Sequence, residues 1–292
     1  MIKVRPYHSS DAAVLLNLYN ILQTGEIESS QQFSLRMEIY ESTGGIAWVL
    51  EDDGEIHGYA TLTSVPGLDG VYELGGGVDP DRRRRGLSSA FLKQIIEQHR
   101  GGKVRQISHP VESTSSPVAL FLRKQGFQVE HSEWGMSLDD LSHIKPVIVP
   151  EEYELRRYPN PITFKWFRDL YDSSFLGLPW YQPYQSEAEL SAEIAANDEI
   201  LFLLERDLHV GFIWLRWPEP KRMEIEPIGV VESHQSRGLG RILMQAGLDK
   251  AAGKGAEGVT IGTWSENTKA IGLYRQLGFK HIRTKTYLAY DT

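Results

Sequence analysis

The sequence predicts an α/β (α+β) protein of two tandem domains, each a mixed, largely antiparallel sheet flanked by helices. The chain has 292 residues, which is longer than most single domains, so we expect two domains of ordinary size. A strand, a glycine-containing turn and a helix occur twice, with Gly86 and Gly238 separated by 152 positions (238 minus 86). The pairs Gly126-Phe127 and Gly278-Phe279 repeat at the same offset. Two landmarks at one offset indicate a duplicated domain.

The composition narrows the class of protein. Apolar residues make up 41% of the chain and charged residues 24%, which is typical of a soluble globular protein. Met1–Arg5 leads directly into a strand-like stretch without a signal peptide, and no apolar run is long enough to span a bilayer, so we expect a cytoplasmic protein without a membrane partner. The chain has no cysteine, which excludes disulfides and cysteine-based metal sites or nucleophiles, and we expect no metal. The net charge of −8 argues against binding to nucleic acid.

Candidate domain boundaries come from a proline-punctuated stretch, His143–Pro150. We expect a first domain at residues 1–142, a linker at 143–152 and a second domain at 153–292. In the first half, strands are predicted at 2–7, 46–50, 56–63, 71–78, 104–108 and from 127, and helices at 12–22, 35–40, 88–98 and 117–124. In the second half, strands are predicted at 153–157, 200–205, 210–217, 223–230, 259–263 and 282–290, and helices at 161–171, from 239 and at 268–277. The order of the first half is thus β-α-α-β-β-β-α-β-α-β, and we expect it to repeat in the second half. Antiparallel hairpins precede the glycine turn, so the fold is not a Rossmann domain.

The turn of the second half, Val230–Gly240, connects a strand to an amphipathic helix whose apolar stripe begins at Leu239. Its two glycines can take conformations that other residues avoid. The first amide groups of a helix have no partner within the helix, and they lie at the positive end of its dipole. The segment is either an ordinary tight turn or a phosphate site.

The copy in the first half, Val78–Ser88, has the same layout and contains the basic run Arg82–Arg85. This run is either a solvated loop or a surface that faces an anionic ligand.

The turn and the element order resemble those of the GNAT superfamily of acyl-CoA-dependent N-acetyltransferases. Gln235–Gly240 matches the family pattern Q/R-x-x-G-x-G/A at every position, and Val259–Phe279 is similar to its second signature. Two such domains, the second better preserved, are similar to the tandem arrangement of mycothiol synthase-like members, although nothing in the residues fixes that substrate. The resemblance implies acetyl-CoA as cosubstrate.

Coenzyme binding is expected along the strand and the turn. A pyrophosphate fits the amides of the turn, and the pantetheine arm would pair with a strand edge. Pro227 removes a ladder donor in mid-strand, so we expect a bulge there that opens a slot; Gly75–Gly77 would make the matching strand of the first half irregular. The predicted coenzyme-binding residues are Ile228, Gly229, Val230, Gln235, Ser236, Arg237, Gly238, Leu239, Gly240 and Asn267, together with Val78, Arg83, Arg84, Arg85, Gly86, Leu87 and Ser88.

The candidate catalytic residues are Glu226 and Tyr274. Glu226 is the expected general base, acting through a water, and by the period of two it should share a face with Ile228; Glu224 is the rival, and both could be solvated strand residues. Tyr274 matches the position where the family commonly places the phenol that protonates the thiolate, or it is a packed aromatic. Backbone amides of 228–230 could hold the oxyanion. Asn267 could also cap the next helix.

Two further features are weighed in the second half. We interpret His234, on the turn, as a surface histidine. The aromatic residues that follow the first helix are part core and part candidate lining of an acceptor pocket; they are Tyr171, Phe175, Trp180, Tyr181 and Tyr184.

The first half departs from the family pattern. Ser88 replaces the last small residue of the turn, Leu122 stands at the offset of Tyr274, and Ser115 at that of Asn267. Leucine cannot donate a proton, so we expect a degenerate domain that supplies structure, a wall of the acceptor site or a second coenzyme site without turnover.

The sequence therefore predicts an acetyl-CoA-dependent N-acetyltransferase that acts by direct attack in a ternary complex on a primary amine of a small molecule, a peptide N-terminus or a lysine. One alternative is a non-catalytic acyl-CoA-binding tandem scaffold. Another is an acyltransferase that uses a hydroxyl acceptor or a longer acyl chain.

Overall fold

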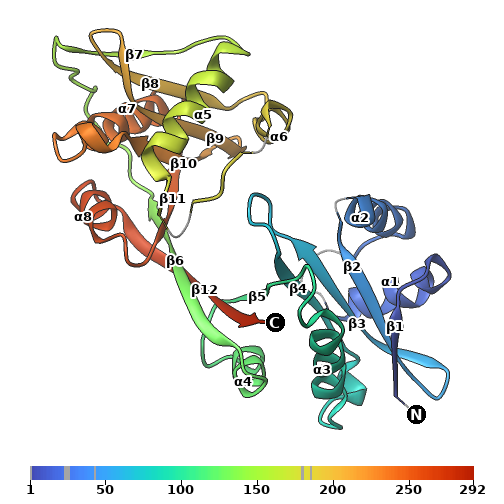
Figure 1. The fold of residues 1–292 in the computed structure, drawn as a ribbon. Coiled ribbons are helices and arrows are strands. Elements are labelled where there is room, and N and C mark those ends of the chain that lie inside the picture. Colours follow the sequence, from blue (N-terminus) through green and yellow to red (C-terminus); the bar gives the residue numbers. More distant parts are fainter. Residues whose placement is uncertain (1, 23–26, 43, 179–180, 185) are drawn as a thin grey trace. The chain divides into compact units, whose positions relative to one another are not determined.

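The computed structural model describes residues 2–22, 27–42, 44–178, 181–184 and 186–292 (Figure 1). The chain forms two compact units. Unit 1 consists of residues 1–130 and 286–292, and unit 2 of residues 131–285. The expected linker at 143–152 lies inside unit 2. Its role as the boundary between two independently folding halves stays a prediction.

Unit 1 is a mixed sheet with helices on both faces. Its elements are β1 (Lys3–Pro6), α1 (Ala12–Leu22), α2 (Ser30–Ser42), β2 (Ile46–Asp52), β3 (Glu55–Ser64), β4 (Val71–Val78), α3 (Leu87–His99), β5 (Gln106–Val111), α4 (Pro117–Lys124) and the start of β6 (Gln128–Leu138). The strand order is β1-β2-β3-β4-β5, followed by the end of β12 (Lys280–Asp291). Only the β4–β5 pair among the described pairs of this unit is parallel.

Unit 2 repeats this plan. Its elements are β7 (Tyr153–Arg156), α5 (Ile162–Phe175), α6 (Glu187–Glu193), β8 (Glu199–Glu205), β9 (Leu208–Glu219), β10 (Arg222–Val230), α7 (Leu239–Gly253), β11 (Gly258–Trp264) and α8 (Thr268–Gln276). The strand order is β12-β6-β11-β10-β9-β8-β7. Here β10 and β11 are the parallel pair. The predicted fold class and element order are confirmed in both halves.

The closing strands are exchanged between the two sequence halves. Residues 133–138 of β6 pair with β11 in unit 2, whereas residues 286–291 of β12 pair with β5 in unit 1. Leu288 in this last segment is fully buried in the core that also contains Phe127. The sequence analysis did not predict this exchange, because hydrophobic periodicity indicates which residues are buried but not which strand edge they join.

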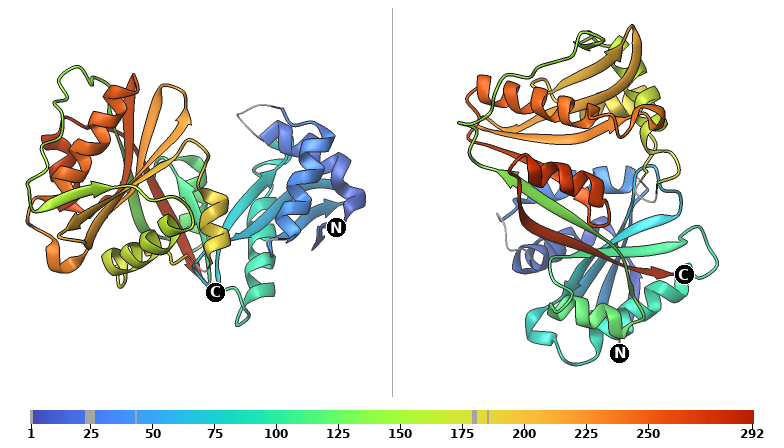
Figure 2. Two further views of the ribbon diagram at one scale, coloured as in Figure 1. Left: turned by 90° about the horizontal axis from the view of Figure 1, so that it is seen from above. Right: turned by 90° about the vertical axis from the view of Figure 1, so that its left-hand side faces the viewer.

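The sheet of unit 2 separates two cores, with α5 and α7 on opposite faces (Figures 1 and 2). We call the face that carries Phe212 and Trp214 and packs against α5 the α5 face. We call the face that carries Ile213 and Ile225 and packs against α7 the α7 face. Because side chains alternate along a strand, each residue of β9, β10 and β11 can be assigned to one of them.

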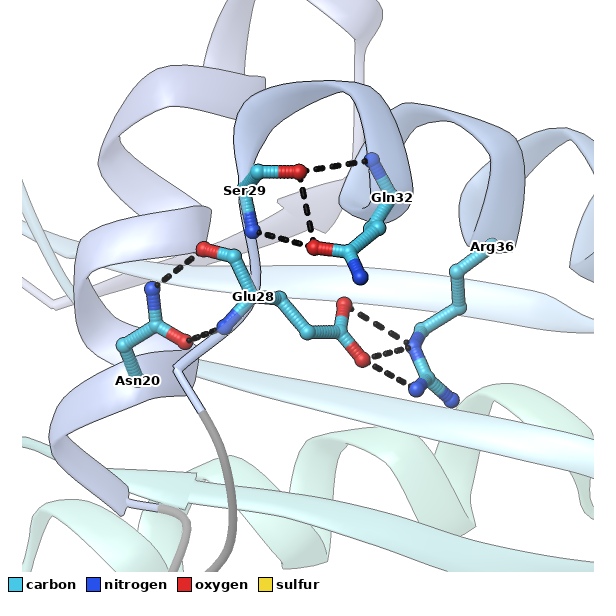
Figure 3. A network of polar contacts seen from close by, with 5 residues as sticks. All are labelled: Asn20, Glu28, Ser29, Gln32 and Arg36. Carbon is cyan, nitrogen blue, oxygen red and sulfur yellow. Dashed lines mark hydrogen bonds and ion pairs between the residues drawn. The ribbon is translucent and has the colours of Figure 1, made fainter.

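Helix α2 begins five residues before the predicted Leu35, at Ser30. Ser29 accepts from the backbone N–H of Gln32 at 3.4 Å, and the Gln32 side chain accepts from the Ser29 amide at 2.9 Å, which is a capping box (Figure 3). Asn20 exchanges two hydrogen bonds with the backbone of Glu28, whose carboxylate pairs with Arg36. The pattern Ser-x-x-Gln was visible in the sequence and would have placed the start correctly.

The exchange of β12 predicts a site-specific loss of stability. Leu288→Ala should lower the free energy of unfolding of unit 1 by about 2–5 kcal/mol, because it removes a fully buried leucine from that core. Hydrogen exchange of β2 and β3 would detect the effect. Ile282→Ala is the control on the same strand, because Ile282 is 55% exposed and belongs to unit 2. Equal effects of the two substitutions would contradict the assignment of the end of β12 to unit 1.

Candidate functional site

The turn before α7 presents unpaired backbone donors. A short 3-10 segment, Glu232–His234, follows β10, then Ser236 and Gly238 take positive φ values of 63° and 83°, and α7 begins at Leu239. In the described part of the chain, the backbone N–H groups of residues 236–240 have no backbone acceptor. Five adjacent donors at the positive end of a 15-residue helix form a site suited to a diphosphate.

The turn before α3 has the same backbone conformation. Arg84 and Gly86, at the offset of 152, have φ values of 62° and 78°. The side chain of Gln235 donates to the carbonyl of Val230 at 3.0 Å, and Arg83 donates to the carbonyl of Val78 at 3.3 Å. Both turns are therefore fastened to the end of the preceding strand by the first residue of the motif. The predicted duplication extends to individual hydrogen bonds.

The strand before the second turn separates from its parallel neighbour. The pairing of β10 with β11 ends at Ile225 and Ile261, although both strands continue beyond these residues. On the other side, Ile225 pairs with Leu215 and Ile228 with Ile213, so three steps along β10 match two steps along β9. This register shift is the bulge expected at Pro227. The edge of β10 toward β11 is thereby left open from Glu226 onward.

The bulge corrects one expectation about orientation. Glu226 was expected to share a face with Ile228, but the extra residue reverses the alternation. Ile225 and Ile228 both pack on the α7 core, whereas the Glu226 carboxyl group lies 3.4 Å from the position that a Cβ would take on Gly262, on the α5 face. Glu226 therefore points away from Ile228.

The matching strand of the first half, which was expected to be irregular at Gly75–Gly77, has no bulge. β4 pairs with β3 without a register shift from Tyr72 to Val78. Gly76 has φ +109°, and a Cβ there would lie 2.2 Å from the carbonyl oxygen of Tyr59, so glycine is needed for close approach of the strands and not for a bulge. Pairing of β4 with β5 stops at Glu73, and His109 Nδ1 then contacts the carbonyl oxygen of Leu74 at 2.7 Å.

Glu226 combines exposure with poor hydration. The residue is accessible at the surface, but its carboxyl group is surrounded by protein, and this desolvation, with Glu224 and Glu133 nearby, raises its pKa to about 7. A carboxyl group with a pKa near 7 can gain and lose a proton at neutral pH.

Tyr274 lies on the opposite side of the same opening. It is 5% exposed, belongs to the α7 core and packs against Phe279 at a ring distance of 6.0 Å. Burial and then the negative charge of Glu226 raise its pKa, so the phenol is protonated at neutral pH. The structure therefore brings the two predicted catalytic residues within electrostatic reach of each other.

Backbone amides of β10 complete the arrangement. Val231 donates to Val210 on β9 at 3.0 Å, and because alternate residues of a strand point their amides to opposite edges, the N–H of Val230 points toward the open edge. An amide in this position can hydrogen-bond a carbonyl oxygen placed between β10 and β11. At the end of β11, Asn267 accepts from the N–H of Ala270 at 3.2 Å, which shows its capping role. In the first half Ser116, and not Ser115, caps the corresponding helix.

His234 was expected at the surface, and this expectation is wrong. His234 is 9% exposed, and its Nε2 lies 3.1 Å from Oε2 of Glu205 at the end of β8. The hydrogen bond from His234 lowers the pKa of Glu205. The sequence analysis missed Glu205, but Asp53 and Arg82 occupy the same offsets in the first half and also interact electrostatically. This recurring pair was the available signal.

The aromatic segment after α5 is largely packed. Tyr171 contacts Phe175 and Tyr184 at ring distances of 5.0 and 5.2 Å, and Tyr181 donates to Asp172 at 2.8 Å. Burial, followed by smaller effects that include Glu226, raises the pKa of Tyr171 to about 12, so this ring lies near the candidate site. Trp180 lies outside the described residues.

A glycine turn whose amides have no backbone acceptor, a bulged strand and a strand that diverges from it form a site for an anionic ligand beside an open strand edge. Comparisons agree. The model of the acetyltransferase (GNAT) family matches residues 162–279, and a GNAT domain model matches residues 43–129. The mycothiol acetyltransferase of Thermomonospora curvata is 32% identical over 235 residues, covering 78% of this chain and 76% of its own. That of Nocardia farcinica is 28% identical over 250 residues, covering 78% and 77%. The chain therefore belongs to the GNAT acetyltransferase family, in its tandem form, and is an acyltransferase.

Solved structures support the fold over the whole chain. A GCN5-related N-acetyltransferase from Sphaerobacter thermophilus has a TM-score of 0.66 at 17% identity and covers 99% of this chain and 95% of its own. A tandem GNAT protein from the clavulanic acid biosynthesis pathway has a TM-score of 0.65 at 17% identity and covers 100% and 98%. No helix in the described ranges is long and apolar enough to cross a membrane.

The contact between His234 and Glu205 predicts a role in holding the turn. His234→Ala should weaken the binding of coenzyme A about fivefold, because losing one hydrogen bond frees the turn to leave the conformation seen here. Calorimetric titration with coenzyme A would measure the change. His143→Ala, which removes a histidine with an 89% exposed side chain, is the control and should bind normally. Unchanged affinity of His234→Ala would show that the turn holds itself.

Proposed function

We propose that the chain is an acetyl-CoA-dependent N-acetyltransferase and that unit 2 transfers the acetyl group directly to a primary amine. One observation carries the proposal. Glu226 and Tyr274 approach from opposite faces of the sheet at the point where β10 and β11 stop pairing. A thioester between the two strands would have a base on one side and a proton donor on the other.

The phosphates of the coenzyme would accept hydrogen bonds from the backbone N–H groups of residues 236–240, while Gln235 holds the turn against Val230. The pantetheine arm would run along the open edge of β10 past residues 228–230 and toward Asn267. The acetyl carbonyl would then lie near the N–H of Val230, which would stabilise the oxyanion.

The chemical steps follow from the two side chains. The amine nitrogen attacks the thioester carbonyl, the carbon–sulfur bond breaks, and an amide forms. Glu226 accepts the proton that the amine loses, through a water. Tyr274 donates its phenolic proton to the departing thiolate.

A small molecule is the acceptor that we favour. The relatives in Thermomonospora curvata and Nocardia farcinica carry the name mycothiol acetyltransferase, and this chain spans about three quarters of each. We propose an acceptor of comparable size with a primary amine, in preference to a peptide N-terminus or a lysine. The cytoplasmic location stays a prediction.

Unit 1 would not catalyse transfer. Leu122 is 2% exposed at the offset of Tyr274, so no phenol is present there. His109 contacts Leu74 where a pantetheine arm would begin to separate β4 from β5. The amides of residues 84–88 keep the conformation of the other turn, so a second coenzyme could bind by its diphosphate without reacting. Coenzyme bound at both turns with no acetyl transfer would favour the scaffold alternative for the whole chain.

Replacing the phenol tests the proton donor. Tyr274→Phe should lower kcat about 100-fold while the Kd for acetyl-CoA stays unchanged, because the ring still fills its place in the core and only the hydroxyl is lost. Acetyl-CoA consumption over a panel of primary amines and alcohols would measure turnover, and the alcohols would reveal a hydroxyl acceptor. Tyr287→Phe, on β12, is the matched tyrosine control. Full activity of Tyr274→Phe with the best acceptor would remove this assignment.

Replacing the base tests the pH dependence. Glu226 must be ionised to accept a proton, and its pKa is about 7, so kcat/KM should fall as the pH drops through about 7. Glu226→Gln should lower kcat/KM about 100-fold at pH 8 and abolish the inflection near pH 7. A pH–rate profile between pH 5.5 and 9 would show both effects. If Glu226→Gln keeps the inflection, another group acts as the base, and Glu224 is the first to examine.

A further inference from the structure

Two glycines are paired with each other beside the candidate base. Gly262 of β11 lies directly opposite Gly135 of β6, in a part of the sheet where the strand order is β12-β6-β11-β10. The carboxyl group of Glu226 lies 3.4 Å from the position that a Cβ would take on Gly262, and opposed residues of an antiparallel pair point to the same face. Both glycines therefore leave the α5 face without side chains of their own. Glycine within a strand often marks a place where a ligand approaches closely.

The side chain of Arg283 lies over the second glycine. Its Cγ and Nε atoms lie 2.6 and 2.8 Å from the position that a Cβ would take on Gly135, so a larger residue there would displace the arginine. Arg283 thus extends from β12 across β6 on the same face on which Glu226 extends from β10 across β11. Among the described residues, Arg283 makes no hydrogen bond or ion pair, and it is exposed. A guanidinium without a partner is available to bind an anionic group.

The neighbouring charged groups on this face contact one another. Glu133, two residues before the glycine of β6, lies 3.8 Å from His131. Arg216 lies opposite Glu224 in the ladder and contacts Glu193 at 3.0 Å. The glycine pair thus separates two groups of opposite charge, a carboxyl group on β10 and a guanidinium on β12, which no ion pair joins in the part of the chain that the structure describes.

The corresponding surface of the first half carries side chains. At the offset of 152, Pro110 and Tyr287 take the places of the two glycines (262 minus 110 and 287 minus 135), and they are likewise opposed to each other in the ladder of β5 and β12. Leu74 stands at the place of the candidate base. The open surface, with a carboxyl group beside it, therefore belongs to the half to which we assign the chemistry.

We propose that the acceptor carries a carboxylate near its reacting amine, and that Arg283 binds this carboxylate while the amine lies at Glu226. The atoms between the two groups would lie over the glycine pair, where neither glycine excludes them. This inference rests on the proposed N-acetyltransferase function and specifies the chemical class of its acceptor. The planar fork of a guanidinium suits a carboxylate, which it can bind by two parallel hydrogen bonds.

The geometry limits the length of the acceptor. Opposed Cβ positions are about 5 Å apart. With the distances of 3.4 Å to Oε2 of Glu226 and 2.8 Å to Nε of Arg283, the two charged groups lie at most about 12 Å apart. A hydrogen bond of about 2.9 Å at each end leaves at most about 6 Å between the amine nitrogen and the carboxylate oxygen. This span admits α-, β- and γ-amino carboxylates.

The test compares amino carboxylates of three lengths with their uncharged amides on the full chain. The carboxylates are glycine, β-alanine and γ-aminobutyrate. The measured quantity is the carboxylate-to-amide ratio of kcat/KM at each length, which added salt should reduce if an ion pair contributes to it. Calorimetric titration of the coenzyme A-saturated protein with the same compounds measures binding separately from turnover.

Substitution of the arginine gives the decisive comparison. Arg283→Gln should lower the carboxylate-to-amide ratio about fivefold for the best-fitting length, as for an exposed ion pair, and Arg283→Lys should restore part of it. The comparison between variants cancels the different reactivities of the amines, because these are the same for every variant. Lys280→Gln removes the same charge from β12, but on the opposite face by alternation, and should leave the ratio unchanged. Gly135→Ala should lower the ratio with the arginine still present, because the added Cβ displaces it.

The outcomes separate this inference from the proposed function. A carboxylate-to-amide ratio that Arg283→Gln leaves unchanged would overturn the inference, and turnover of the amides would then still support the N-acetyltransferase function. Absence of turnover, together with carboxylate binding that Arg283→Gln weakens, would instead count against the proposed function and support the carboxylate site. Absence of both turnover and binding would overturn the inference as well.

Discussion

The separation of β10 from β11 is the constraint on which the rest of the site depends. Two parallel strands that stayed paired to their ends would leave no free amide for a ligand. The extra residue at the bulge both ends the pairing after Ile225 and reverses the faces of the residues that follow. It puts Ile228 into the α7 core and leaves Glu226 on the α5 face. One local irregularity therefore produces the opening and positions the candidate base beside it.

The two halves show which parts of such a site are separable. Their turns agree in φ to within about 5° at the paired positions and share the same fastening bond to the preceding strand. Beyond the turn they diverge: unit 1 has a regular β4, His109 against Leu74, and a buried leucine at the position of the phenol. A turn conformation suited to an anion is thus retained in unit 1 without the side chains to which we assign the chemistry of unit 2. The backbone of the turn depends on a few glycines, whereas the reactive part depends on the side chains and the register of two strands.

Much of the fold could be predicted from the sequence, because duplication, alternation and the Gly-containing turns are local patterns. The positions of Pro227 and Asn267 predicted a bulge and a cap, and both are present. The orientation of Glu226 was predicted wrongly, because a period of two fails across a bulge whose place in the ladder only pairing reveals. His234 was predicted to be exposed because it lies on a turn, but its environment is set by Glu205, 29 residues earlier. The start of α2 was missed although its capping box was legible in Ser29 and Gln32. Errors thus arose where one segment depends on a distant partner, with the cap of α2 as the exception.

The shared strand β12 also has a consequence for biosynthesis. A chain leaves the ribosome N-terminus first, and early domains usually fold as soon as they emerge. Unit 1 cannot fold completely as it emerges, because the edge of β5 pairs with residues 286–291, which are synthesised later. Until translation reaches that segment, the sheet exposes an unpaired strand and an unfilled place for Leu288. Folding of the first half is therefore completed only after the second half has been synthesised, and the two units do not finish folding one after the other.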